Sequence, residues 1–337
     1  MSEFELTDEI RELPPADYYN ILALSGGGYR GLFSALVLSD IERIIACPLG
    51  KKFSLLAGTS IGAIIAAALA LGHPAARVAE VIRRHASEVF DARIRILGRP
   101  LGLRRPSGPF GGLLGSKFQL QALEKILHEV LGNDRDIKLS DVEMPLVVIA
   151  VCATTKTPAI FSNLPAGKYS IRGATLKDAL LASCAAPSYF PAFDTDHRTF
   201  VDGGLVANAP DMLAVTEVIA GGIARLDRCR VLSIGTVSKD QAAVPSRIGS
   251  RGLAEWLFGD LVPLTLQAQE RLTIYQAKVM LGANFLRIDA LPSPDQAAVL
   301  ELDNATEDAS RTLSLLAHQT TGGDFPDRIV AWLRVRP

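Results

Sequence analysis

An uncharged run of 19 residues, FSLLAGTSIGAIIAAALAL at 53–71, decides the fold of this chain. By length and hydropathy alone, the run could form a membrane-spanning helix. The sequence GTSIG at 58–62 interrupts it, because clustered glycine and small polar residues are typical of turns. We therefore interpret the run as a buried strand over 53–57, a tight turn, and a buried helix over 60–71.

Similar strand and helix patterns alternate along the rest of the chain. Further strands are predicted at residues 20–25, 145–153, 199–202, 231–235 and 284–288, and further helices at 31–46, 75–90, 119–131, 176–185, 253–281, 306–316 and 327–333. Short buried strands that alternate with helices are typical of an α/β fold. We expect a mainly parallel sheet with helices on both faces.

The composition favours a globular protein with a sizeable core. Of the 337 residues, 48% are hydrophobic and 21% are charged. The 35 basic and 36 acidic residues almost cancel, so a nucleic-acid polymer is not an expected partner. The four cysteines are scattered without a CxxC spacing, which argues against zinc, redox and disulfide frameworks. The polar start MSEFELTDEIRELPP lacks the apolar core of a signal peptide, so we expect a cytoplasmic location.

A single catalytic domain is expected over residues 20–316, since no change of composition divides this stretch. Residues 1–19 are predicted to be an N-terminal tail or arm. Residues 317–337 are predicted to be a C-terminal helical extension, and residues 91–115 form a basic insert within the domain.

The insert, DARIRILGRPLGLRRPSGPFGGLLG at 91–115, carries five arginines against one acidic residue. Glycine, proline and arginine dominate it, so no regular structure is predicted there. Three interpretations stay open. The insert could be a surface loop that covers part of the core, or a lid that places Arg104 and Arg105 on lipid phosphates at a membrane surface. It could also bind an anionic regulator through its arginines.

The GTSIG sequence matches the Gly-x-Ser-x-Gly pattern of a nucleophile elbow, with Ser60 at its centre. Gly58 and Gly62 would let the backbone close tightly on either side of the serine. The hydroxyl would then project into a cleft at the start of a helix, where the helix dipole favours developing negative charge. A glycine-serine turn without a catalytic role is the alternative interpretation of this motif alone.

The glycine run SGGGYRG at 25–31 follows the first predicted strand and opens a helix. Backbone N–H groups of Gly26, Gly27 and Gly28 in that position form an anion site, which in acyl transfer would hold the oxyanion of the tetrahedral intermediate. Arg30 could support this loop electrostatically. The same residues match the dinucleotide fingerprint GxGxxG, but the acidic residue expected about 20 positions later is missing from the corresponding stretch.

A serine hydroxyl needs a nearby proton acceptor to act as a nucleophile. None of the five histidines lies in a motif typical of a catalytic histidine. Asp202 ends a predicted strand and is followed by Gly203 and Gly204, a position suited to a base at the edge of a sheet. A simple Asp-Gly-Gly turn is the alternative interpretation.

Together, the three motifs resemble those of the patatin-like phospholipases, which combine Gly-Gly-Gly-x-[Arg/Lys]-Gly, Gly-x-Ser-x-Gly and Asp-Gly-[Gly/Ala] in this order. The segment ASCAAPSYFPA at 182–192 is similar to another motif of that family, and the likeness extends over about residues 20–316. The resemblance implies a hydrolase that cleaves ester bonds of membrane phospholipids, with Ser60 and Asp202 as a catalytic dyad. It implies the three glycines of the first motif as oxyanion donors, and no metal or cofactor.

The stretch ILALSGGGYRG at 21–31 also resembles bacterial members of that family that cyclic nucleotides switch on in anti-phage defence. A cyclic-nucleotide activator is therefore a further expected partner, together with peripheral contact to membrane lipid. Two other functions stay open. One is an esterase with a Ser60–Asp202–His318 triad, which has the residue order of α/β-hydrolases. The other is a non-catalytic lipid-binding protein of the same fold.

Overall fold

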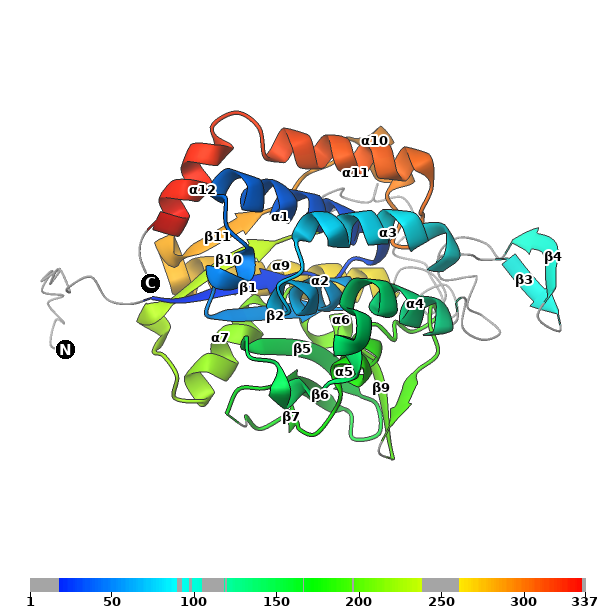
Figure 1. The fold of residues 1–337 in the computed structure, drawn as a ribbon, viewed down its shortest axis with the longest axis horizontal. Coiled ribbons are helices and arrows are strands. Elements are labelled where there is room, and N and C mark those ends of the chain that lie inside the picture. Colours follow the sequence, from blue (N-terminus) through cyan, green and yellow to red (C-terminus); the bar gives the residue numbers. More distant parts are fainter. Residues whose placement is uncertain are drawn as a thin grey trace, which may run out of the picture.

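The structure is a computed structural model that describes residues 18–89, 93–96, 99–104, 118, 120–165, 167–195, 197–237 and 261–334. In these residues a nine-stranded sheet runs through the centre of the molecule (Figure 1). The main path across the sheet has the order β11 (Phe285–Ile288), β10 (Cys229–Ile234), β1 (Tyr19–Leu24), β2 (Leu55–Thr59), β5 (Leu146–Cys152), β6 (Thr157–Ser162) and β7 (Ser170–Ile171). Off this path, β9 (Arg198–Asp202) pairs with β5, and β8 (Phe193–Thr195) pairs with β9.

The strands from β11 to β5 are parallel, whereas β6 and β9 run antiparallel to β5. Alternate residues of one strand face two separate hydrophobic clusters, because strand side chains point to opposite sides of the sheet. Leu22 and Leu56 lie in one cluster, and Ile21 and Leu55 lie in the other. The prediction of a mainly parallel sheet is confirmed, and the antiparallel pairing around β5 is an addition that the sequence did not predict.

Helices cover both faces of the sheet, as predicted. One face packs against α1 (Gly31–Ile45), α2 (Ile61–Ala70), α3 (Ala75–Val89), α4 (Leu120–Leu131), α5 (Leu176–Ser183), α11 (Glu307–Thr320) and α12 (Phe325–Arg334). The other face packs against α6 (Gly204–Ala207), α7 (Asp211–Ala220) and α9 (Leu261–Leu281). The remaining short elements are α10 (Pro294–Val299) and 3-10 turns at Gly28–Arg30, Leu49–Lys51, Gly132–Asp136, Leu139–Asp141, Leu226–Arg228 and Gly282–Asn284.

The uncharged run at 53–71 folds as the sequence predicts. It forms β2 and then α2, whose residues from Ile61 to Leu69 are all buried in the core. In the part of the chain that the structure describes, no helix combines the length and the apolar character needed to cross a membrane.

Part of the insert at 91–115 has regular structure, which corrects the prediction made from its composition. β3 (Arg93–Ile96) and β4 (Arg99–Arg104) pair antiparallel as a separate two-stranded sheet, seen at the edge of the molecule in Figure 1. Arginine alternates with isoleucine in the sequence RIRI, and this period of two suits a strand. The rest of the insert lies outside the described residues, and so does most of the predicted tail at 1–19.

The C-terminal helices pack on the same face of the sheet as α1. α11 continues through residue 316, where the end of the catalytic domain was predicted, and α12 contacts α1. Thr321, just after α11, donates a hydrogen bond of 2.7 Å to Asp40 of α1. The separation of a catalytic domain from a C-terminal extension stays a prediction.

Two strand ends meet along one edge of β5. β2 runs parallel to β5, and its last residue, Thr59, pairs with Ile149. β9 runs antiparallel to β5, and its last residue, Asp202, pairs with the next residue, Ala150. β6 occupies the opposite edge of β5, so β2 and β9 approach each other from opposite directions along the same edge. The residue after Thr59 is Ser60, and the topology therefore brings Ser60 and Asp202 to one point.

Candidate active site

Ser60 occupies a strained turn between β2 and α2. Its backbone has φ 54° and ψ −126°, a conformation that residues with a side chain rarely adopt. A Cβ atom on Gly58 would lie 2.4 Å from the carbonyl oxygen of Gly62, and one on Gly62 would lie 2.3 Å from that of Leu24. The space around the turn therefore requires both glycines, and the turn has the geometry of a nucleophile elbow.

The Ser60 hydroxyl lies beside the Asp202 carboxylate, close enough to lower its pKa. Asp202 is only 7% exposed, and its Oδ1 also accepts a hydrogen bond of 2.7 Å from the N–H of Gly204. The backbone thus orients a buried carboxylate toward the serine hydroxyl.

Burial raises the pKa of Asp202 from its ordinary value of 3.8 to about 6, although the N–H of Gly204 and the nearby Ser60 hydroxyl favour the ionised form. A carboxylate with this pKa is ionised at neutral pH and is a stronger base than an exposed aspartate. The buried thiol of Cys184 lies against the same pair, and burial raises the pKa of that thiol well above its ordinary value. Of these two groups, Asp202 is the one that can accept a proton near neutral pH.

Ser183 connects the turn at Ser60 with the segment that carries Asp202, a role that was not predicted from the sequence. Its buried hydroxyl accepts a hydrogen bond of 2.9 Å from the N–H of Ser60 and donates one of 2.6 Å to the carbonyl of Ile149. Its carbonyl accepts a hydrogen bond of 3.4 Å from the N–H of Gly203, where a Cβ atom would lie 2.1 Å from the carbonyl oxygen of Ile149. The available signal was a serine within the apolar end of a predicted helix, ALLASCAA.

The glycine loop lies directly beside the serine, since a Cβ atom on Gly26 would be 3.4 Å from the Cβ of Ser60. The N–H of Gly26 already donates a hydrogen bond of 2.9 Å to the carbonyl of Asn208. Among the described residues, the N–H groups of Gly27 and Gly28 have no hydrogen-bond partner. Of the three glycines predicted as oxyanion donors, Gly27 and Gly28 therefore have a backbone N–H group that can donate to a bound anion.

Polar side chains hold the glycine loop in place. The carbonyl of Gly26 accepts hydrogen bonds from Thr236 Oγ1 at 2.9 Å and from Asn208 Nδ2 at 3.4 Å. Arg30 reaches back to the loop and donates from Nε to the carbonyl of Gly27 at 3.4 Å. Arg30 is therefore in direct contact with the loop that it was expected to support.

A largely buried charge cluster centred on Arg287 lies next to the base of this loop. Nη1 of Arg287 donates hydrogen bonds of 2.8 Å to the hydroxyls of Ser25 and Ser233. Nη2 forms ion pairs with Glu270 at 2.7 Å and Asp289 at 2.8 Å, and the arginine side chain is 8% exposed. Because Ser25 immediately precedes the glycines, the guanidinium fixes the point where the loop leaves β1.

Both carboxylates of the cluster are also linked to the glycine loop, through Asn208 and Val237. Glu270 Oε2 accepts a hydrogen bond of 2.9 Å from Nδ2 of Asn208, the residue whose carbonyl holds the N–H of Gly26. Asp289 Oδ1 accepts one of 2.9 Å from the N–H of Val237, and the carbonyl of Val237 accepts one of 3.0 Å from Arg30. This cluster was not predicted from the sequence, in which its signal is an arginine within the short apolar strand NFLRI.

His318, the base of the alternative triad, is exposed in the last turn of α11. The contacts that Ser60 and Asp202 make within the described residues include Ser183, Cys184 and Gly204, but no histidine. This geometry favours the dyad over the triad.

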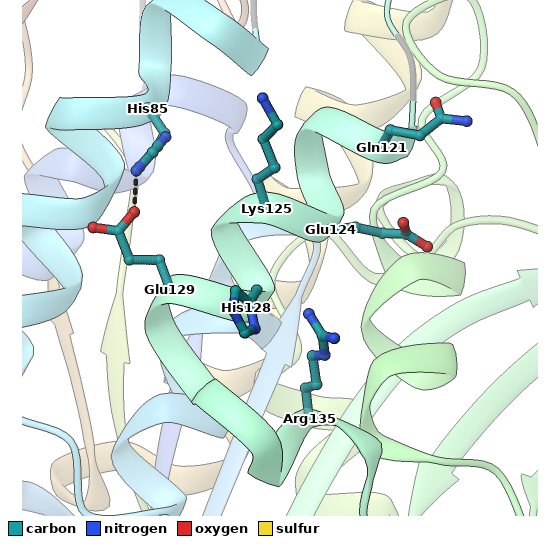
Figure 2. A pocket seen from close by; sticks show the side chains of 7 residues that line it. All are labelled: His85, Gln121, Glu124, Lys125, His128, Glu129 and Arg135. Atoms are coloured by element: carbon teal, nitrogen blue, oxygen red, sulfur yellow. Dashed lines mark hydrogen bonds and ion pairs between the residues drawn. The ribbon is translucent and has the colours of Figure 1, made fainter.

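A separate hollow of about 550 Å³ lies between α3 and α4 (Figure 2). Its lining carries both signs of charge and comprises His85, Gln121, Glu124, Lys125, His128, Glu129 and Arg135. His85 and Glu129 are bonded to each other at one side of it. No residue predicted for catalysis lines this hollow, and within the described ranges no group of three or more His, Cys, Asp or Glu residues is arranged to hold a metal ion.

The fold and the turn at Ser60 define an α/β protein with a nucleophile elbow. A model of the Patatin family, described as patatin-like phospholipase, matches residues 22–215, which is more than half of the chain. The chain therefore belongs to the patatin-like phospholipase family, as its motifs predict. Members of this family are hydrolases that act on lipid esters.

Three relatives align with most of this chain. A cGAMP-activated phospholipase from Pseudomonas aeruginosa is 33% identical over 301 residues, which cover 88% of this chain and 85% of the relative. A cGAMP-activated phospholipase from Vibrio cholerae is 30% identical over 330 residues, covering 90% and 91%. A cUMP-AMP-activated phospholipase from Escherichia coli is 27% identical over 269 residues, covering 75% and 76%. The likeness therefore extends over more of the chain than the family match alone.

Asp202 should make the stability of the protein depend on pH. Its pKa of about 6 in the folded state lies above the ordinary 3.8, so the folded state binds the proton more tightly than the unfolded chain does. This stabilisation is complete below about pH 4 and is lost as the pH rises through about 6. Asp202→Asn, which imitates the protonated form, should therefore stabilise the protein at pH 8 by up to about 3 kcal/mol and have little effect at acidic pH.

Calorimetric melting of both proteins at about pH 4 and pH 8 measures this difference. In the unmodified protein, kcat/KM on a soluble p-nitrophenyl ester should rise with pH through about 6, because the base must be ionised. A melting difference that is the same at both pH values, with a flat rate profile, would show that Asp202 does not titrate as described.

Arg287 should be needed for turnover as well as for stability. Arg287→Met leaves the largely buried carboxylates of Glu270 and Asp289 without their cation and releases Ser25, so we expect a stability loss of about 3–5 kcal/mol and a fall in kcat of about 10²-fold. Arg230→Met is the matched control, since Arg230 is also buried but lies near the start of β10, bonded to the carbonyl of Trp332 at 2.7 Å. The control should lose stability and retain kcat in the fraction that stays folded. Equal kcat in the two variants at a temperature where both are folded would show that Arg287 is structural only.

Proposed function

We propose that this protein is a phospholipase A-type lipid acyl hydrolase with Ser60 as nucleophile and Asp202 as general base. The observation that carries the proposal is the placement of Ser60, at a nucleophile elbow, beside the buried carboxylate of Asp202. Membership of the patatin-like phospholipase family supports the substrate class, which is ester bonds of membrane phospholipids.

In the first half of the reaction, Asp202 accepts the proton of Ser60 as Oγ attacks the ester carbonyl. A tetrahedral intermediate forms, and its negative oxygen accepts hydrogen bonds from backbone N–H groups. When the ester C–O bond breaks, Asp202 returns the proton to the departing alcohol oxygen of the lysophospholipid. The acyl group stays on Ser60 as an ester.

In the second half, water replaces the alcohol. Asp202 accepts a proton from the water as its oxygen attacks the acyl-serine carbonyl, and a second tetrahedral intermediate forms in the same anion site. Breakage of the bond to Ser60 Oγ releases the fatty acid, and the serine regains its proton from Asp202. One carboxylate therefore serves as base and acid in both halves.

The anion site proposed for both intermediates consists of the N–H groups of Gly27 and Gly28. Gly26 contributes differently, because its N–H is bonded to Asn208 and its carbonyl to Thr236. We infer that Gly26 anchors the loop while the next two glycines donate to the oxyanion. Pre-oriented backbone donors of this kind typically contribute about 10²–10³ in turnover.

A cyclic nucleotide is the proposed activator, and anti-phage defence is the proposed setting. Relatives described as cGAMP-activated and cUMP-AMP-activated phospholipases align with 75–90% of this chain, which supports regulation of the same kind. Regulation of the activity is physically reasonable, because an unregulated phospholipase would degrade the membrane of its own cell. The activator must bind more tightly to the active form than to the resting form, since only a difference in affinity shifts the equilibrium.

Loss of either member of the dyad should remove nearly all activity. Ser60→Ala and Asp202→Asn should each lower kcat on p-nitrophenyl esters by several orders of magnitude, and the double variant should be no worse than the single ones, because the two residues act as one unit. Initial-rate kinetics on variants with native circular dichroism make this comparison.

His318→Ala is the control that separates the dyad from the triad. We expect it to keep the activity of the unmodified protein. Activity retained in Asp202→Asn and lost in His318→Ala would establish the triad, and no hydrolysis by the unmodified protein with any activator would leave a lipid-binding function.

Activation should be visible with purified protein and a panel of cyclic nucleotides. We expect cGAMP or cUMP-AMP, tested beside cyclic di-AMP and cyclic di-GMP, to raise phospholipid hydrolysis in a saturable way and to raise the melting temperature. Full activity without nucleotide, and no thermal shift with any of them, would indicate a constitutive enzyme.

A further inference from the structure

The exposed side of α9 carries an unusual concentration of apolar side chains. Eight large hydrophobic side chains are exposed in the described part of the chain, and five of them belong to this one helix. Four of the five, Leu264, Leu272, Tyr275 and Val279, are 51–65% exposed and recur at helical spacing along one side. We name these four residues the α9 stripe.

The charges of α9 are distributed unevenly around this stripe. The exposed charged residues of the helix are Arg271 and Lys278, both basic. Its single acidic residue, Glu270, points the other way and pairs with Arg287. Apolar residues flanked by basic residues, without exposed acidic ones, are typical of helices that lie on an anionic lipid surface. Tyrosine also suits the level of the lipid headgroups.

The inner side of the same helix binds the segment that follows Asp202. The Gln269 side chain donates a hydrogen bond of 2.6 Å to the carbonyl of Val206 and accepts one of 2.9 Å from the N–H of Asn208. These two residues lie four and six positions after Asp202. A lipid surface in contact with the α9 stripe would therefore be separated from the Asp202 segment by roughly one helix diameter of about 10 Å.

We propose that the α9 stripe is the surface through which the enzyme docks on an anionic phospholipid bilayer. The proposal rests on the phospholipase function, because a bilayer that holds the substrate is a surface the enzyme must touch. A second copy of the chain fits the stripe less well. Stable interfaces use about 20–30 residues on each side, and a symmetric pairing of α9 with itself would bring basic residues together.

Binding to vesicles tests the proposal directly. All proteins carry Ser60→Ala so that the lipid stays intact, and the vesicles contain phosphatidylcholine with or without phosphatidylglycerol. The stripe variant is Leu272→Gln with Val279→Gln. The matched control is Leu291→Gln with Leu315→Gln, two residues that are 68% and 48% exposed outside α9.

Flotation should show binding of the stripe variant to anionic vesicles reduced by roughly tenfold or more, with binding of the control unchanged. Lys278→Gln should weaken binding to anionic vesicles and leave binding to neutral vesicles as it was. Equal flotation of stripe variant and control overturns the proposal. It is also overturned if light scattering shows a dimer that the stripe variant dissolves while vesicle binding persists, since the stripe is then a contact between copies.

Activity measurements keep this result separate from the proposed function. With Ser60 restored, the stripe variant should hydrolyse a soluble ester at the rate of the unmodified protein and vesicle lipid at least several-fold more slowly. If the unmodified protein hydrolyses neither substrate, the proposed function fails while the flotation result still stands. If both substrates slow equally in the stripe variant, the stripe acts on catalysis and is not a docking surface.

Discussion

The whole site depends on one edge of β5, which is shared by two strands of opposite direction. Ile149 pairs with the end of β2 and Ala150 pairs with the end of β9, so the nucleophile and its base meet end to end. The carbonyl of Ile149 also accepts the hydroxyl of Ser183, and only glycine fits against it at position 203. Small displacements of this edge would change the Ser60–Asp202 contact directly, because both residues leave their strands at this point.

Two features of the site cost free energy of folding, and the surrounding core must offset this cost. Ser60 holds a backbone conformation that costs about 1–3 kcal/mol, and Asp202 is ionised in a place that favours its neutral form. Both follow from function, since the strain exposes the hydroxyl and the burial makes the carboxylate more basic. The compensation is visible in α2, which begins at the elbow and is buried from Ile61 to Leu69. The apolar run that resembles a membrane helix in the sequence is therefore what keeps the nucleophile in position.

Features set by neighbouring residues could be predicted from the sequence, and features set by distant pairing could not. The elbow at Ser60 needs only the local sequence GTSIG after an apolar strand, and the strand and helix patterns identified an α/β fold. The role of Ser183 depends on a bond to Ser60 across 123 residues, and that of Arg287 on a bond to Ser25 across 262. Periodicity indicates which face of one segment is buried, but not which strand lies beside it. For the same reason, the antiparallel pairing of β9 with β5 was not foreseen, although Asp202 at its end was.

α9 connects two parts of the site that lie far apart in the sequence, the segment after Asp202 and the residues that hold the glycine loop. Gln269 binds the segment after Asp202, while Glu270 binds Asn208 and Arg287, which hold the glycine loop. The segment that follows the base and the two residues that hold the glycine loop are thus bonded to two consecutive residues of one helix. A displacement of α9 would therefore act on both sets of contacts together. A ligand that controlled the enzyme through this helix, lipid or nucleotide, would have to bind one position of the helix more tightly than another.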